Sequence, residues 1–314
     1  MPTDDQLVDR TVIEKLLLSV VPERVADLRG LWDLYLPEFW LRPDHAGLVL
    51  SAGNRRVRFT HRTMVHDWLV AFAGWKGFRL YGPVVSTAFA TRVSLSPELL
   101  NGDPGREREQ QSIQDVLYTA RQIARQDVPI ELVHWPEEVP RPAADGSAFP
   151  TEDRATYDLL CIATAGAFLH ELKHLMFDRR HDRPARIEEE RRCDIFARNF
   201  ILEQVATYAA QVGHEISDVL GKRVMGLALT AYVIHEGTPH FDQPGSTEYP
   251  STAERLATFT DVQGIPDNAY SWNFVSAIAL SMLDSRGGLK ATIEFENPKH
   301  LCCKLLEHLR AVMQ

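Results

Sequence analysis

The spacing of hydrophobic positions predicts short strands and helices in the first part of the chain. Residues 4–36 carry apolar positions at helical spacing, interrupted by Pro22. Residues 47–59 contain two short runs of strand-forming residues around an Ala-Gly-Asn turn. Thr60 follows as a helix N-cap and predicts a helix that continues through Trp75. These segments together predict a small sheet with helices beside it.

The middle of the chain predicts two more strands and a loop. Residues 91–95 form one strand candidate, and residues 128–135, VPIELVHW, form another that is bounded by prolines. A helix is expected at 110–125 and a proline-rich loop at 136–150. The strand at 128–135 is open to two interpretations: a core strand, or an edge strand that pairs with an extended substrate.

Beyond residue 151 nearly every periodic segment is helical. A capping box formed by Ser251 and Glu254 marks the start of one of these helices. Because strands come early and helices late, we expect an α+β fold that is mostly helical. It would join a small N-terminal or central sheet to a helical core. The N-terminal region would span 1–100 and the second region 101–314, unless both form one continuous domain. The expected helices are 153–177, 187–210, 216–235, 252–262, 268–285 and 298–313.

Composition narrows the class of protein. The 314 residues are 45% hydrophobic and 25% charged, as in soluble globular proteins. The net charge of −9 argues against a general nucleic-acid binder, which needs clustered Lys and Arg. Four cysteines without a CxxC pair argue against a disulfide framework. The longest strongly apolar stretch, Leu159–Leu169, is too short to span a bilayer. We therefore expect a cytoplasmic protein with no membrane and no nucleic-acid partner.

The chemistry concentrates in residues 166–177, GAFLHELKHLMF, which contain an HExxH motif. His170 and His174 lie four residues apart on a helix, so both imidazoles face one side and can bind one Zn²⁺. Zinc lowers the pKa of a bound water to about 7, and Glu171 can act on that water as general base and acid. The alternative is an ordinary buried helix with two satisfied histidines. Burying three ionisable groups directly after an apolar run is costly, which favours the metal site.

A third metal ligand is expected from the segment IEEERRCDIFARNF. Glu190 and Asp194 lie four residues apart and share one helix face. Glu190 completes a His-His-Glu set that leaves one position open, and Asp194 accepts the outer N–H of a ligand histidine. The alternative is a solvated helix start, because carboxylates favour helix N-termini. That alternative is adopted here for Glu188 and Glu189.

Several neighbouring residues receive structural interpretations. Cys193 is expected to be a small buried hydrophobe and not a ligand, because it points about 100° away from Asp194 on a helix. The basic segment 179–186 is expected to be a solvated connection, including Arg179, Arg180, His181, Arg183 and Arg186. Small residues of the motif helix are expected to let the helix of Glu190 approach closely; these are Ala163, Gly166 and Ala167.

Hydrolysis at such a site needs a donor for the oxyanion that develops on the scissile carbonyl. His235, His240 and Tyr249 follow the helix expected at 216–235, and any of the three can supply this donor. The alternative is that each is an ordinary loop residue without a special role.

The order of these motifs resembles the gluzincin metallopeptidases. The strings FLHELKHLMF, EEERRCDIFARNFIL and YPSTAERLATF most resemble the Lit-type phage-exclusion peptidases, over roughly residues 150–262. Weaker likeness exists to the ImmA/IrrE family and to CAAX-type membrane proteases. The resemblance implies that Glu190 is a zinc ligand and that Asp194 orients a ligand histidine. It also implies that region 101–314 forms a zincin-like catalytic core. Related families often carry His-Pro where this chain has Tyr249-Pro250.

The resemblance also implies a function. Lit-type members are bacterial defence proteases that cut a host translation factor when a phage component is sensed. We therefore expect a zinc-dependent endopeptidase with a protein substrate such as elongation factor Tu and a phage-derived activator. The alternatives are an ImmA/IrrE-like protease that cleaves a regulator, and a non-catalytic module with a structural zinc. Glu171 argues against the last, because a structural site has no need of a carboxylate there.

Overall fold

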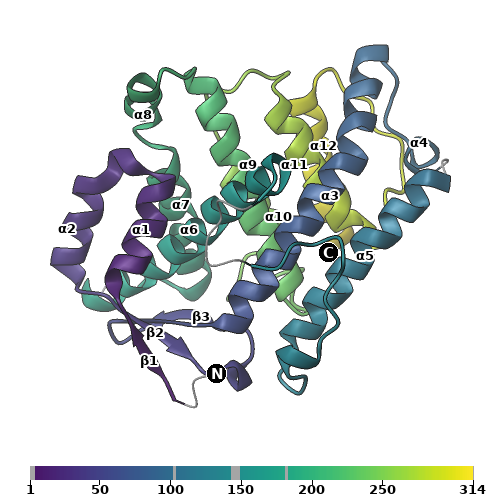
Figure 1. The fold of residues 1–314 in the computed structure, drawn as a ribbon. Coiled ribbons are helices and arrows are strands. Elements are labelled where there is room, and N and C mark those ends of the chain that lie inside the picture. The colour runs from purple at the N-terminus through teal and green to yellow at the C-terminus, as the bar shows by residue number, and fades with distance from the viewer. Residues whose placement is uncertain (1–3, 102–103, 143–148, 181–182, 314) are drawn as a thin grey trace.

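The computed structural model describes residues 4–101, 104–142, 149–180 and 183–313. These residues form a mostly helical α+β fold, as predicted, with a small sheet on one side (Figure 1). The strands are β1 (Gln6–Val8), β2 (Glu38–Arg42), β3 (Leu50–Gly53) and β4 (Arg56–Thr60). The helices of the N-terminal half are α1 (Arg10–Val20), α2 (Val25–Tyr35), α3 (His61–Thr91), α4 (Pro97–Asn101) and α5 (Pro104–Ala124). Those of the C-terminal half are α6 (Thr151–Arg180), α7 (Arg186–Leu202), α8 (Val205–Val212), α9 (Ile216–Gly237), α10 (Thr252–Thr260), α11 (Tyr270–Asp284) and α12 (Pro298–Met313).

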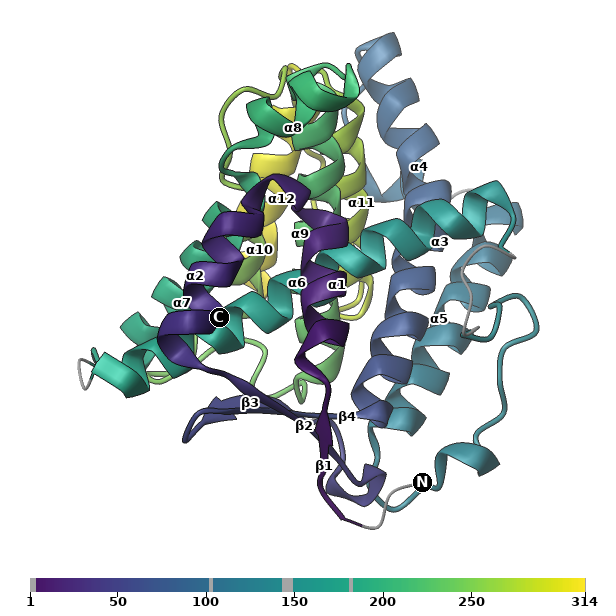
Figure 2. The same ribbon diagram turned by 60° about the vertical axis from the view of Figure 1, so that its left-hand side comes forward.

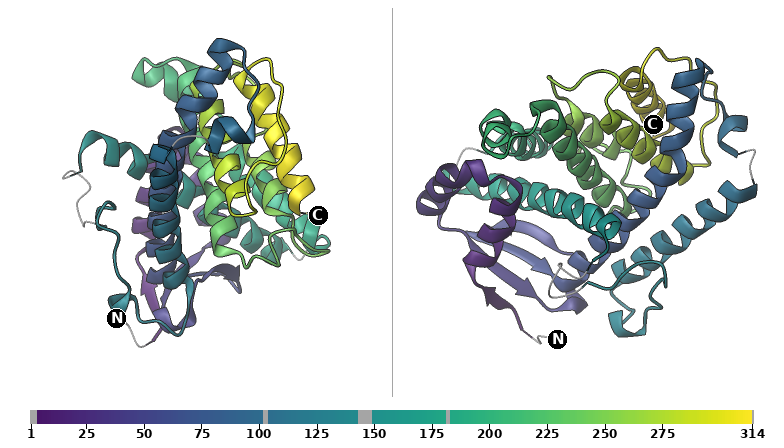
Figure 3. Two further views of the ribbon diagram at one scale, coloured as in Figure 1. Left: turned by 90° about the vertical axis from the view of Figure 1, so that its right-hand side faces the viewer. Right: turned by 45° about the horizontal axis from the view of Figure 1, so that its top comes forward.

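The sheet has the strand order β1-β2-β4-β3, so β3 lies at an edge. Strand β2 pairs with β4 in parallel, whereas the β1–β2 and β3–β4 pairs are antiparallel. Helix α6 lies along this sheet, and helices α9 to α12 lie beyond it (Figure 3). The ring of Phe168 on α6 packs edge-on against Phe39 of β2 and Phe59 of β4. The sheet therefore anchors α6 two residues before the HExxH motif.

Helix α6 crosses α9 closely at the centre of the molecule (Figure 2). A Cβ atom at Gly226 of α9 would lie 2.4 Å from the Cβ of Ile162, and one at Gly166 of α6 would lie 3.1 Å from Thr230 Oγ1. Glycine is thus required for this contact, because any side chain at Gly226 would push the helices apart. The small residue Gly166 serves the approach of α9, not the approach of α7 that the sequence suggested.

Several predicted elements are confirmed and others are wrong. The caps at Thr60 and at Ser251 with Glu254 are present. Helix α3 continues to Thr91 and not to Trp75, because it is buried on nearly all sides and shows no amphipathic stripe that would mark its end. The predicted helix 187–210 breaks between α7 and α8, where Gln204 adopts a positive φ of 61°.

The two strands predicted at 91–95 and 128–135 are wrong. Arg92 adopts a left-handed conformation that ends α3, and only Leu95 forms an isolated bridge, to Ile293. The segment 128–135 contains a single 3₁₀ turn, Ile130–Leu132. Strands β1 and β2 were not predicted. Strand β1 lies within residues 4–36, which were expected to be helical, and β2 follows that region. Residues 143–148 of the expected proline-rich loop lie outside the described residues.

One cluster of buried hydrophobic residues extends from Ile13 to Met313. It draws on both of the regions, 1–100 and 101–314, that the sequence distinguishes; their independence as domains stays a prediction. Within the described residues, no helix combines the length and the apolar character needed to cross a bilayer.

Candidate active site

Helix α6 brings the HExxH side chains to the floor of a cleft. His170 and His174 are both buried, with 8% and 5% of their surface exposed. Their Nε2 atoms lie 3.1 Å apart. Glu171 is half-buried and lines the same cleft. The one-turn spacing thus places both imidazoles on one face, as predicted.

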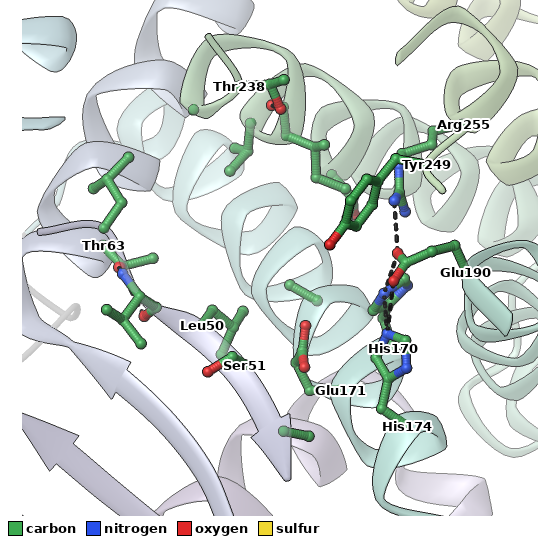
Figure 4. A pocket seen from close by; sticks show the side chains of 18 of the residues that line it. Leu50, Ser51, Thr63, His170, Glu171, His174, Glu190, Thr238, Tyr249 and Arg255 are labelled. Atoms are coloured by element: carbon green, nitrogen blue, oxygen red, sulfur yellow. Dashed lines mark hydrogen bonds and ion pairs between the residues drawn. The ribbon is translucent and has the colours of Figure 1, made fainter. Parts of the chain in front are cut away.

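Glu190 of α7 meets the two imidazoles at their Nε2 atoms (Figure 4). Its Oε2 lies 3.4 Å from Nε2 of His170, and its Oε1 lies 3.3 Å from Nε2 of His174. Three potential ligand side chains therefore converge on one point. The structure brings together the ligand set that the sequence proposed.

The outer nitrogen of each imidazole is held by a separate carboxylate. Nδ1 of His170 faces Asp194 Oδ1 at 2.8 Å, as predicted for Asp194. Nδ1 of His174 faces Glu189 Oε1 at 2.6 Å. Glu189 is 2% exposed, so its interpretation as part of a solvated helix start is wrong. One available signal was its position four residues before Cys193, which was expected to be buried, so that both lie on one helix face.

Two arginines balance part of this negative charge. Arg255 of α10 is buried and bridges Glu190 Oε2 at 2.8 Å and Asp194 Oδ1 at 2.7 Å. Arg186 donates to Glu190 Oε1 at 2.9 Å and stacks over the ring of Tyr249. With neutral imidazoles the cluster retains a formal charge of −2, which one divalent cation would balance. Its charged members are Glu171, Glu189, Glu190, Asp194, Arg186 and Arg255.

Arg186 was expected to belong to a solvated connection, and its contact with Glu190 corrects that view. Its neighbour Arg183 also lines the cleft and pairs with Asp178. His181 of the same segment lies outside the described residues.

The pKa values follow from burial and charge. Burial raises the pKa of Glu171, an effect that the two histidines and a backbone hydrogen bond from Ala52 oppose. Burial would lower the pKa of His170, but hydrogen bonds to Asp194 and Glu190 outweigh it and raise that pKa to about 9. Burial would raise the pKa of Glu190, but the imidazoles and Arg255 lower it well below the usual range. Glu190 is therefore an ionised carboxylate.

Cys193 also lies close to the imidazoles. One nitrogen of His170, one nitrogen of His174 and the Cys193 sulfur lie within 4.8 Å of one another and could hold a metal ion. Cys193 is fully buried and does not line the cleft. Burial, together with the charges of Glu190 and Glu171, raises the pKa of its thiol strongly, which disfavours the thiolate that binds metals.

The cleft has a volume of about 480 Å³ and is lined by residues of β3, α3, α6, α7, α9 and α10 and by Tyr249. Strand β3 forms one rim of the cleft, whereas no residue of 128–135 lines it. Because Val49 accepts a hydrogen bond from Thr60 of β4, alternation along the antiparallel pair turns the N–H and C=O groups of Leu50 and Ala52 to the open side. This open edge runs beside Glu171 (Figure 4).

The three predicted oxyanion donors lie in different places. Tyr249 lines the cleft, is 44% exposed, and points its hydroxyl into the cavity (Figure 4). His235 is fully buried and faces Thr252 Oγ1 and Ser285 Oγ, and burial lowers its pKa to about 3. His240 lines an adjoining cavity. Of the three, only Tyr249 lies among the described residues that line the cleft.

The comparison with protein families gives one match. The model of the Peptidase U49 family, the Lit-type proteases, covers residues 57–275, which include the HExxH motif and α7 but not the rim strand β3. The comparison with curated proteins and the comparison with solved structures each found no match. The match extends over more than half of the chain. The chain therefore belongs to the Peptidase U49 family and is a peptidase.

Proposed function

We propose that the chain is a zinc-dependent endopeptidase whose ligands are His170, His174 and Glu190. Tetrahedral zinc with bonds of 2.0 to 2.2 Å separates its ligand atoms by about 3.3 to 3.6 Å. The distances of 3.1, 3.3 and 3.4 Å between the converging atoms fit this geometry closely. The convergence of these three side chains at the floor of an open cleft is the observation that carries the proposal.

Glu190 is preferred over Cys193 as the third ligand. Its pKa is lowered, so it offers an anionic oxygen, whereas the pKa of the Cys193 thiol is raised. Glu190 also lines the cleft, where a substrate can reach the metal, and Cys193 does not. Asp194 and Glu189 fix the imidazole rings by accepting their Nδ1–H groups, which leaves both Nε2 lone pairs free.

The steps of peptide hydrolysis are then assigned to zinc, Glu171 and Tyr249. Bound zinc supplies Lewis acidity, which acidifies a water molecule and polarises the scissile carbonyl. Glu171 takes a proton from the attacking water and delivers it to the leaving amine nitrogen. Its half-buried carboxyl, with a raised pKa, suits both transfers. Tyr249 is the candidate to donate a hydrogen bond to the developing oxyanion, because its hydroxyl points into the cleft.

The substrate is proposed to bind as an extended peptide along β3. Leu50 presents its N–H and C=O groups to the cleft side of this edge strand. A peptide that pairs there as an added strand would run past Glu171 and the metal ligands. The open edge supports an endopeptidase, because a chain can enter and leave at either end of the strand.

Family membership supports the proposal of a role in phage defence. The substrate would be a host translation factor, elongation factor Tu, cut when a phage-derived activator is present. The test is a comparison of new protein termini in infected bacteria that express wild type or Glu171→Gln. A zinc-dependent terminus within elongation factor Tu that is absent with Glu171→Gln is the expected result.

The zinc chemistry is tested separately. Purified wild type and Glu171→Gln should each hold about one zinc per chain, and only wild type should cleave. Wild type that neither carries nor takes up zinc, or Glu171→Gln that cleaves at the wild-type rate, would refute the proposal. Removal of zinc with a chelator and its return should abolish and restore cleavage.

A further inference from the structure

The cleft continues away from the metal ligands into a pocket that the reaction does not use. Its polar end is formed by His66 and Asp67 of α3, which are 1% and 4% exposed and both line the cavity. Leu48, Val233 and Ile234 form apolar walls beside them. This part of the cleft therefore combines apolar walls with a buried polar end.

The polar end presents hydrogen-bond acceptors. His66 Nδ1 lies 3.0 Å from Asp67 Oδ1. Burial raises the pKa of Asp67, and a cation bound beside it would stabilise the ionised form, which can only accept a hydrogen bond from His66 Nδ1. The remaining ring nitrogen, Nε2, is then an acceptor, and it is buried without a hydrogen-bond partner. Among the described residues, the His66 imidazole alone lies within ion-pair distance of Asp67. His66 Nε2 therefore lacks a hydrogen-bond donor, and among the described residues the Asp67 carboxylate has no Lys or Arg as a cationic partner.

The hydroxyl groups along the same wall do not supply that donor. Thr63 Oγ1 donates to Val49 O, and Thr238 Oγ1 donates to Ile234 O. Thr230 Oγ1 donates to backbone carbonyls of α6 and α9. Each of these three hydroxyl groups therefore donates its proton to a backbone carbonyl oxygen. The wall complements a ligand that brings donors or positive charge.

We propose that this pocket binds a lysine or arginine side chain of the substrate, with Asp67 and His66 as the residues that determine this specificity. The inference rests on the proposed peptidase function and names a feature of its substrate. The long aliphatic stem of such a side chain fits the apolar walls, and its cationic head supplies the missing donors. A neutral side chain of the same length would leave the Asp67 carboxylate without a counter-charge.

The first test measures binding without catalysis. Zinc-loaded wild type is titrated with Nα-acetyl-arginine amide and with Nα-acetyl-citrulline amide, which keeps the length but lacks the charge. A hydrogen-bonded charge pair at a buried site predicts at least about tenfold tighter binding of the arginine probe. Equal binding of the two probes, or no detectable binding of the arginine probe, overturns the proposal.

Variants locate the effect. Asp67→Asn should abolish the preference for the arginine probe while zinc content and thermal stability stay near wild type. Asp158→Asn removes a carboxylate that pairs with Lys222 on the surface of α6 and should keep the preference. A preference that survives in Asp67→Asn places the arginine elsewhere and overturns the proposal. The wild-type comparison of the two probes holds even if Asp67→Asn does not fold.

The second test uses a peptide library digested by wild type, Glu171→Gln and Asp67→Asn. Wild type should cut with Lys or Arg enriched at one fixed position, and Asp67→Asn should reduce that enrichment at least about tenfold. Cleavage without a basic preference overturns the pocket but not the peptidase. Absence of zinc-dependent cleavage, with a wild-type preference for the arginine probe, overturns the peptidase but not the pocket.

Discussion

The carboxylate of Glu189 provides a strict test of the proposed metal site. Glu189→Gln keeps the length of the side chain but replaces the anionic acceptor of the His174 Nδ1–H with a neutral one. The present contact is 2.6 Å long and buried, which is typical of a strong charge-assisted hydrogen bond. The substitution should therefore weaken zinc binding without removing a ligand.

The expected loss follows from the position of Glu189 behind the ligand. Loss of a partner that orients a metal ligand costs about 10–100-fold in metal affinity, or about 1.4–2.7 kcal/mol. Glu189→Gln, which still accepts a hydrogen bond, should lie near tenfold, and Glu189→Leu near a hundredfold. Asp194→Asn should behave like Glu189→Gln, because Asp194 holds the other imidazole at 2.8 Å. Glu190→Gln should lose far more, because it replaces an anionic ligand.

The assay is competition for zinc against a chromophoric chelator of known affinity. Glu188→Gln is the matched control. Glu188 is the residue before Glu189, and its side chain is 44% exposed and pairs with Arg192 at the surface. It should bind zinc like wild type. Unchanged affinity in both Glu189 variants would refute the orienting role. If Asp194→Asn failed to bind zinc while Glu190→Gln still bound it, Asp194 would be the third ligand.

Two further predictions concern stability. Arg255→Ala should lower the free energy of unfolding by about 3–5 kcal/mol in urea, because it removes the buried cation that bridges Glu190 and Asp194. Arg191→Ala, which breaks an exposed pair, should cost less than about 1 kcal/mol, and equal losses would contradict this. Because burial lowers the pKa of His235 to about 3 in the folded chain, the unfolded chain takes up this proton first as the pH falls below about 6.5. His235 should thus remove up to about 2 kcal/mol of stability between pH 6.5 and 5, and His235→Gln should flatten the pH dependence of urea unfolding by that amount; an unchanged slope would contradict it.

Short-range sequence patterns were enough to predict several helix ends and the arrangement of the HExxH histidines. The four-residue spacing of His170 and His174 puts both rings on one helix face in any context. The caps at Thr60 and Ser251 satisfy the first N–H groups of helices within three or four residues of chain. The same reasoning paired Glu190 with Asp194. Each of these features depends on neighbours along the chain, which the sequence displays directly.

Tertiary contacts decided what local patterns left open. Strand β2 pairs with β4, some 18 residues away along the chain, and the partner fixes its register. The segment 128–135 has strand-forming residues but lies beside no strand, so its propensity is not realised. Helix α3 is surrounded by other helices, which removes the amphipathic pattern that would have shown its length.

The same division holds at the site. The sequence contains three consecutive glutamates, and helical spacing alone does not show which are buried. The packing of α7 against α6 places Glu189 behind His174 and leaves Glu188 half-exposed. His66 and Asp67 likewise line the cleft only because α3 packs beside it. The HExxH motif lies about 100 residues later in the chain. Burial depends on what packs against a residue, so the sequence predicted the proposed ligands and Asp194, whereas only the fold placed Glu189 and Arg186 beside them.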